Sequence, residues 1–166
     1  YQQANKLFAQ KNYFEAAQCY EKYLASEKKI KPRGQAFAVE KKRKGRTNLN
    51  PHEEAIYHLA QCYLNTHDFV QAEKWYRQAI PFSRAYPACE YEYAVSLRAN
   101  QKYDEAMEAI DSFLQNYSVM DELLLNADRE YENLKYIRSQ LRNTNKDQFI
   151  LIPENATGAT SSYALT

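Results

Sequence analysis

Hydrophobic and polar residues recur in the same order three times along the chain. In each copy an aromatic residue is followed three positions later by alanine and seven positions later by a large apolar residue, which places all three on one face of a helix. A second helical pattern, with a small and a large residue three positions apart, precedes each copy. The pattern therefore predicts pairs of helices, with aromatic anchors at Tyr13, Phe69 and Tyr103.

The spacing of these anchors indicates a repeat. Phe69 and Tyr103 are 34 residues apart, whereas Tyr13 and Phe69 are 56 apart, which is 34 plus an insertion of 22. A 34-residue period with these residue types resembles the tetratricopeptide repeat. The resemblance implies an all-α fold, a right-handed superhelix of about three helix pairs with a C-terminal capping helix and an extended C-terminal tail. Small residues such as Ala60 and Ala72 are expected where the two helices of one repeat pack closely.

The repeats divide the chain into segments. We expect a repeat domain over 1–141, and residues 142–166 as a linker or the start of a following domain. Within the repeat domain the expected parts are repeats at about 1–26, 51–84 and 87–117, a basic insertion at 27–50 and a capping helix at 119–141. A helix after the last repeat usually covers its exposed apolar face.

Helix-start signals agree with these boundaries. Asn50, followed by Pro51 and Glu53, is typical of a capping box that opens a helix, and Asp68 is placed to cap the next one. Ser118 with Asp121 predicts the start of the capping helix. In the tail, the apolar run from Phe149 to Ile152, followed by Pro153, predicts an extended segment.

Composition narrows the classes of function. The 166 residues include only three Gly and five Pro, too few for a turn-rich β fold. No apolar run approaches the roughly 20 residues that span a bilayer, so we expect no transmembrane segment. The three Cys and three His lack the spacing of metal ligands, and no phosphate-binding loop or nucleophile elbow occurs. We therefore expect no metal, no cofactor and no enzymatic activity.

The net charge of +1 conceals an uneven distribution. Residues 25–50 contain nine basic and two acidic residues, a net charge of +7, which leaves −6 for the rest of the chain. The densest basic run, proposed as an anionic-surface contact, is Lys41, Lys42, Arg43 and Lys44. The alternative is a solvated extension of the second helix of repeat one, followed by a turn at residues 31–34 and a further helix through residues 35–39. A nucleic-acid partner is not favoured, because the run has no interleaved aromatic residues to stack on bases.

Stacked helix pairs form a concave groove lined by the first helix of each repeat. Counting from the anchors, the partner-binding candidates in this groove are Asn5, Tyr57, Gln61, Asn65, Tyr91 and Arg98. Aromatic and amide side chains together suit a protein or peptide partner. The alternative is that these residues solvate the inner wall or pack against the chain's own tail. A chaperone-type carboxylate clamp is not expected, because Tyr57 and Tyr91 stand where such a clamp needs charge or amide.

Three strings point to a more specific resemblance: residues 71–76 with Ala79, residues 91–103, and residues 159–164. They resemble the N-terminal part of large Bacteroidetes envelope proteins. In that family, tetratricopeptide repeats precede a WD40-like β-propeller, a carboxypeptidase-regulatory-like domain and an outer membrane protein A-like peptidoglycan-binding domain, and some members belong to the gliding and type IX secretion apparatus.

The envelope resemblance implies a non-catalytic docking module in the periplasm or cell envelope. Association with peptidoglycan or the outer membrane would then occur through domains outside this chain. The alternative hypothesis is a free-standing cytoplasmic or nuclear adaptor whose basic insertion binds nucleic acid or another polyanion. This second hypothesis predicts binding that weakens steeply with salt.

Overall fold

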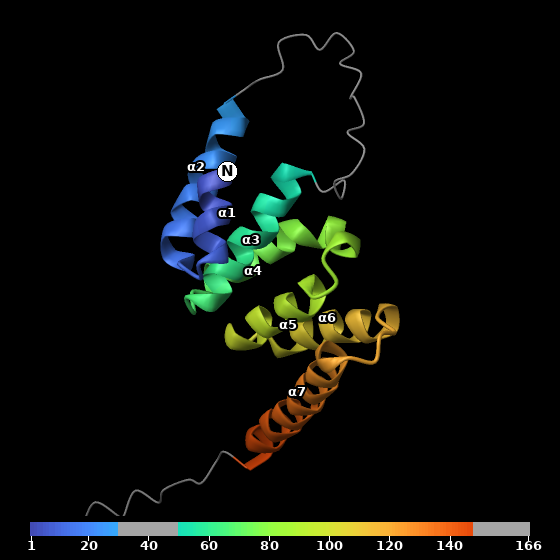
Figure 1. The fold of residues 1–166 in the computed structure, drawn as a ribbon. Coiled ribbons are helices and arrows are strands. Elements are labelled where there is room, and N and C mark those ends of the chain that lie inside the picture. The colour runs from blue at the N-terminus through green and yellow to red at the C-terminus, as the bar shows by residue number, and fades with distance from the viewer. Residues whose placement is uncertain (30–49, 148–166) are drawn as a thin grey trace, which may run out of the picture.

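The computed structural model describes residues 1–29 and 50–147 (Figure 1). These ranges form an all-α structure without strands, as predicted. In chain order the elements are α1 (Gln2–Ala9), α2 (Tyr13–Lys29), α3 (Pro51–Asn65), α4 (Phe69–Ala79), the 3₁₀ helix η1 (Ile80–Ala85), α5 (Cys89–Ala99), α6 (Tyr103–Asn116) and α7 (Glu122–Asp147). The predicted extended segment at 149–153 and the basic run at 41–44 lie outside the described residues.

The helices pack in chain order. α1 packs on α2, α3 on α4 and α5 on α6, and each pair contacts the next through α2 with α3 and α4 with α5. α7 packs on α6 and also contacts α5 (Figure 1). Contacts between α3 and α5 bring alternate helices together as well. The first helices of neighbouring pairs therefore lie next to each other.

The turn inside each helix pair repeats with the sequence period. Its central residue has a left-handed backbone, with φ of 59° at Lys11, 62° at His67 and 63° at Gln101. In every turn, the residue after the left-handed one donates its backbone N–H to the carbonyl five residues earlier, with a donor–acceptor distance of 3.0 Å. The pairs are Asn12 to Leu7, Asp68 to Tyr63 and Lys102 to Leu97. This is the bonding of a Schellman motif, which normally uses glycine at the left-handed position. The turns of the three copies are thus equivalent in backbone structure.

The predicted small residues lie in the core. All six alanines of the repeat pattern are fully buried: Ala4, Ala16, Ala60, Ala72, Ala94 and Ala106. The large residues at the third position of the pattern, Tyr20, Tyr76 and Ile110, are also fully buried. Because alanine at these positions lets two helix backbones approach closely, the tight pairing follows directly from the sequence.

Helix caps agree with the sequence in most details. The Asn50 side chain accepts a hydrogen bond from the backbone N–H of His52 at 3.0 Å, and Asp68 accepts from the N–H of Gln71 at 3.1 Å. Asn50 donates its amide to the Glu53 carboxylate at 3.4 Å, so the two side chains bond to each other rather than forming the predicted capping box.

The capping helix differs from the prediction at both ends. α7 begins at Glu122, after an Asp121 cap that accepts from the N–H of Leu124 at 3.1 Å, and it continues to Asp147, past the expected end at residue 141. Ala127 and Leu134 of α7 are fully buried. The expected start was too early because Asp121 caps the helix, which leaves Met120 outside it.

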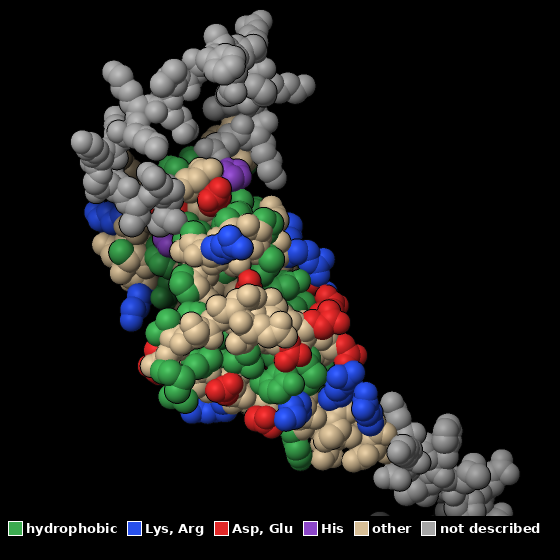
Figure 2. Space-filling model, turned by 90° about the vertical axis from the view of Figure 1, so that its right-hand side faces the viewer, with side chains coloured by type: hydrophobic (Ala, Val, Ile, Leu, Met, Phe, Trp, Pro, Cys, Tyr) green, Lys and Arg blue, Asp and Glu red, His purple; other side chains and the backbone are tan. Residues whose placement is uncertain are grey.

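Figure 2 shows one face of the molecule, where acidic and basic side chains are interspersed and apolar side chains reach the surface between them. Among the exposed large apolar residues, Phe14 and Val70 are each 68% exposed and hold the same place in copies one and two, directly after the aromatic anchor. In the described ranges, no helix is both long enough and apolar enough to cross a membrane.

Candidate functional site

The six predicted partner-binding residues all lie on the first helices of the repeats, α1, α3 and α5. Four of them bond to a carboxylate of the next first helix or of α7: Asn5 to Glu54, Tyr57 and Gln61 to Glu92, and Arg98 to Glu130. We call this series of contacts the first-helix ladder, and the surface formed by α1, α3 and α5 the first-helix face. The ladder joins consecutive repeats side by side.

The first step of the ladder joins α1 to α3. The Asn5 amide nitrogen lies 3.4 Å from the Glu54 carboxylate, while the Asn5 oxygen accepts from the Tyr20 hydroxyl at 2.8 Å. That hydroxyl oxygen is also 3.1 Å from Nδ1 of His58, whose ring stacks on Phe8 with centroids 4.3 Å apart. Burial lowers the pKa of His58, with the Glu54 charge acting in the opposite direction. Both polar ends of Asn5 are therefore engaged within the chain.

The second step joins α3, α4 and α5 around one carboxylate. Glu92 accepts hydrogen bonds from the Tyr57 hydroxyl at 2.8 Å, the Gln61 amide at 3.0 Å and the Tyr76 hydroxyl at 3.1 Å. In the described part of the chain, no Lys or Arg forms an ion pair with Glu92. Burial raises the pKa of Glu92, and the three hydrogen bonds offset this only in part.

Tyr57 is a core residue rather than a groove surface. Its side chain is 7% exposed and its ring stacks on Tyr86, with ring centroids 4.3 Å apart. Helix-face counting placed Tyr57 toward the groove, but Tyr86, which follows η1, covers it. The expectation that Tyr57 contacts a partner directly is therefore corrected: its ring packs in the core and its hydroxyl fixes Glu92.

The third step joins α5 to α7. Arg98 donates from Nε to Glu130, a carboxylate that is only 8% exposed. Tyr91 is half-buried, with its ring 6.2 Å from that of Phe113. Asn65 is exposed, and its amide donates to the backbone carbonyl of Gln61 at 2.7 Å. Of the six predicted residues, Asn65 alone is classed as exposed, and Tyr57 alone is buried.

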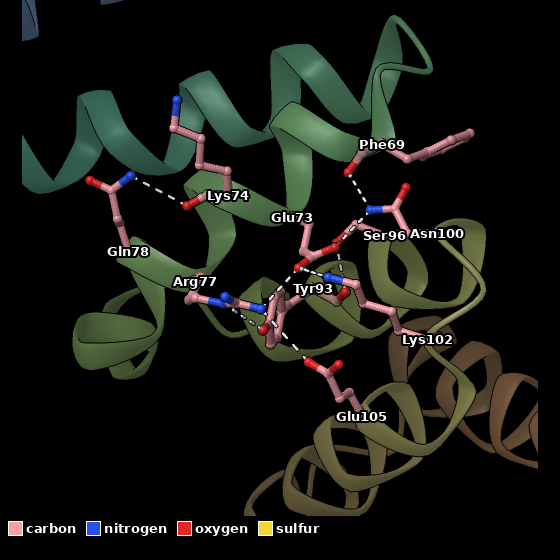
Figure 3. Close-up of polar contacts among 10 residues, drawn as sticks. All are labelled: Phe69, Glu73, Lys74, Arg77, Gln78, Tyr93, Ser96, Asn100, Lys102 and Glu105. Atoms are coloured by element: carbon pink, nitrogen blue, oxygen red, sulfur yellow. Dashed lines mark hydrogen bonds and ion pairs between the residues drawn. The ribbon is translucent and has the colours of Figure 1, made fainter.

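A second polar junction lies on α4, at a residue that sequence analysis did not identify (Figure 3). Glu73 is 7% exposed and accepts from Lys102 Nζ at 2.7 Å, from the Asn100 amide at 2.8 Å and from Arg77 at 2.9 Å. Burial alone would raise the pKa of Glu73, but the hydrogen bonds from Lys102 and Asn100 and the charges of Lys102 and Arg77 outweigh it and lower the pKa. The junction joins α4 of repeat two to the turn between α5 and α6 in repeat three.

Arg77 extends this junction to α6. Its guanidinium lies 3.3 Å from the Tyr93 hydroxyl and 3.7 Å from the Glu105 carboxylate (Figure 3). The sequence signal for Glu73 was its position in the repeat, because the equivalent residues of copies one and three are Ala17 and Met107. A charge at a position that is otherwise apolar indicates a buried polar contact rather than a solvated face.

Cys62 and Cys89 are fully buried and pack in the core. Burial raises the pKa of both Cys62 and Cys89 to about 12, so that each remains a protonated thiol near neutral pH. Within residues 1–29 and 50–147, no group of three or more His, Cys, Asp or Glu side chains is placed to hold a metal ion.

Two surface cavities, of about 520 and 380 Å³, lie away from the first-helix ladder. The larger is lined by residues that include Pro87, Phe113 and Tyr117, and the smaller lies between the start of α6 and the end of α7.

The anionic-surface candidates Lys41, Lys42, Arg43 and Lys44 lie outside the described residues. The comparisons with known proteins add no relative: no protein-family model matches the chain, and a search of curated proteins returns no match.

Proposed function

We propose that this chain is a non-catalytic docking module, a tetratricopeptide-repeat superhelix that binds a protein or peptide across its first-helix face. The observation that carries the proposal is the first-helix ladder. It holds α1, α3 and α5 side by side by contacts from Asn5 to Glu54 and from Gln61 to Glu92, so that side chains from successive repeats form one extended surface. The equivalent turns at Lys11, His67 and Gln101 support the repeat assignment.

Among the six candidates, the proposed direct contacts are those with exposed or half-exposed side chains, except Asn5, whose amide nitrogen and oxygen are both engaged within the chain. They are Asn65, Gln61, Tyr91 and Arg98. Asn5 and Tyr57 act indirectly in this proposal, because they position Glu54 and Glu92. A face that combines amide, phenol and charged groups suits peptide recognition by backbone hydrogen bonds and ring stacking.

Photo-crosslinking tests this proposal. A photoreactive phenylalanine analogue replaces Asn65 on α3 in one variant and Gln18 on α2 in a control, since both side chains are exposed. We expect a discrete protein adduct in cells from position 65 and none from position 18. Equal adducts from both positions, or none from position 65, would place binding on another surface and overturn the proposal.

The location of the module is a separate part of the proposal. The resemblance to Bacteroidetes envelope proteins supports a scaffold in the periplasm or cell envelope, including the type IX secretion apparatus, with anchoring by other domains. The test is the coding sequence beyond Thr166 together with fractionation of the native protein. A propeller-like and a peptidoglycan-binding segment downstream are expected, and recovery of the native protein in the cytoplasmic fraction would contradict this part alone.

A further inference from the structure

The first-helix face carries acidic groups without matching cations. α3, its central helix, contains Glu53 and Glu54 and neither Lys nor Arg. α5 adds Glu92, while its Arg98 is already paired with Glu130. Across the described ranges, none of Glu53, Glu54 and Glu92 has an ion pair with Lys or Arg. α1 adds one basic residue, Lys6, so the three helices together still carry more carboxylates than cations and the face keeps a negative balance.

The histidine that approaches Glu54 does not neutralise this charge. His58 approaches Glu54 at 4.0 Å, but burial lowers the pKa of His58, so its ring is largely neutral near pH 7. The Glu54 side chain is 24% exposed, enough for a partner to reach it. An external cation is therefore the group that this carboxylate lacks.

Aromatic rings lie beside the carboxylates. Tyr86 is close enough to Glu54 and Glu53 for their charges to add to the effect of burial, and its pKa is raised to about 12. In the described structure, the buried Tyr86 hydroxyl has no hydrogen-bond partner. The Tyr86 ring is stacked on Tyr57, so the group that it can offer a partner is its unpartnered hydroxyl, which can donate to a peptide carbonyl after a small side-chain movement.

These features favour one chemistry of partner. We infer that the segment docking on the first-helix face is a basic peptide of a partner protein, whose Lys or Arg side chains pair with Glu53, Glu54 and Glu92 beside the Tyr86 hydroxyl. This inference rests on the proposed docking function and specifies the partner's charge. Acidic peptides and nucleic acids are repelled by the same carboxylates.

Glu92 gives the interaction a distinct pH signature. It faces Tyr57 and Gln61 of α3 and Tyr76 of α4, which are neutral, and lies near the protonated thiol of Cys89. Because burial raises the pKa of Glu92, a cation placed beside it lowers that pKa and releases a proton. Binding of a basic peptide therefore strengthens as the pH rises through the titration of Glu92.

The test measures fluorescence anisotropy of the full chain with three labelled peptides. They share one short sequence, with its charged positions all Lys or Arg, all Gln, or all Glu. The variant Glu53→Gln with Glu54→Gln is compared with Glu15→Gln plus Glu108→Gln, which removes the same charge from exposed positions on α2 and α6. We expect the basic peptide to bind best, about tenfold more weakly to the first variant, and unchanged to the control. Circular dichroism confirms that both variants fold.

Each alternative outcome has a defined meaning. Equal binding of the Gln or Glu peptide, or equal loss in the control variant, overturns the inference about charge while the docking function still stands on the crosslink at position 65. Binding of the basic peptide only after Lys41, Lys42, Arg43 and Lys44 are changed to Ser would show that the chain's own basic segment occupies the face. That result would overturn the inference of a partner protein. Absence of the position-65 crosslink would count against docking itself, whatever the peptide result.

Discussion

Replacing Glu73 tests whether the junction in Figure 3 holds repeats two and three together. Glu73→Ala removes the acceptor of three donors, from Lys102, Asn100 and Arg77. Breaking a buried ion pair costs about 3 to 5 kcal/mol. Lys102 and Arg77 are 41% and 59% exposed and regain water, so we expect the lower limit, about 3 kcal/mol, and a melting temperature lower by roughly 10 °C.

The pH dependence separates this electrostatic role from simple packing. Because the pKa of Glu73 is lowered below its usual 4.5 in the folded chain, its contribution is fully present above pH 4.5 and is lost as the pH falls through the folded-state value. Glu73→Gln preserves shape and removes charge. We therefore expect its destabilisation, measured by urea unfolding, to be largest near pH 7 and to shrink below pH 4.5.

Glu105→Gln is the matched control for the Glu73 variants. Glu105 also contacts Arg77, at 3.7 Å, but it is 54% exposed, and exposed pairs contribute less than about 1 kcal/mol. Equal destabilisation by Glu105→Gln and Glu73→Gln, or a Glu73→Gln effect that does not change with pH, would refute the reasoning from burial and charge.

Three further predictions concern other buried or strained positions. Gln101→Gly should stabilise the fold by about 1 kcal/mol in urea unfolding, because glycine adopts the left-handed backbone without the cost borne by Gln, and an unchanged midpoint would contradict this. Because the pKa of Glu92 is raised in the folded chain, the contribution of Glu92 to the free energy of unfolding is fully present below pH 4.5 and is lost as the pH rises through the folded-state value. Glu92→Gln should therefore gain stability relative to wild type between pH 4.5 and 7, and parallel pH profiles would argue against a buried charge. Cys62 and Cys89 should react with a thiol reagent only on unfolding, as followed by mass spectrometry, and rapid labelling of either in the native chain would contradict their burial.

The repeat pattern predicted what depends on residues near one another in sequence. Ala72 and Tyr76 lie on one helix face at fixed spacing, so their burial follows from periodicity. The cap at Asp68 is equally local, since it bonds to an N–H three residues away. The left-handed turns carried no such signal, because Lys11, His67 and Gln101 replace the expected glycine.

The ladder could not be predicted from the sequence because each of its contacts joins one repeat to the next repeat or to α7. Gln61 and Glu92 are 31 positions apart, and periodicity placed Gln61 on the inner wall without indicating that Glu92 of the next first helix would meet it. Tyr57 was misplaced for the same reason: the residue that covers it, Tyr86, follows an irregular connection after α4. Position within the repeat indicates which way a side chain points, but the neighbouring repeat determines whether it remains exposed.

Docking and repeat stacking should be coupled, because they share carboxylates. Glu54 and Glu92 accept hydrogen bonds that join α1 to α3 and α3 to α5, and both are also proposed to pair with the partner. A cation beside Glu92 offsets the cost of burying that charge, so the folded arrangement of α3 and α5 gains stability on binding. Peptide-induced stabilisation follows from the affinity itself, so the independent quantity to compare with affinity is the stability of the free chain. Gln61→Ala removes an amide that donates to Glu92 without removing charge, so it should lower both the stability of the free chain and the affinity for the basic peptide, and a loss of stability with unchanged affinity would show that stacking and docking use separate contacts.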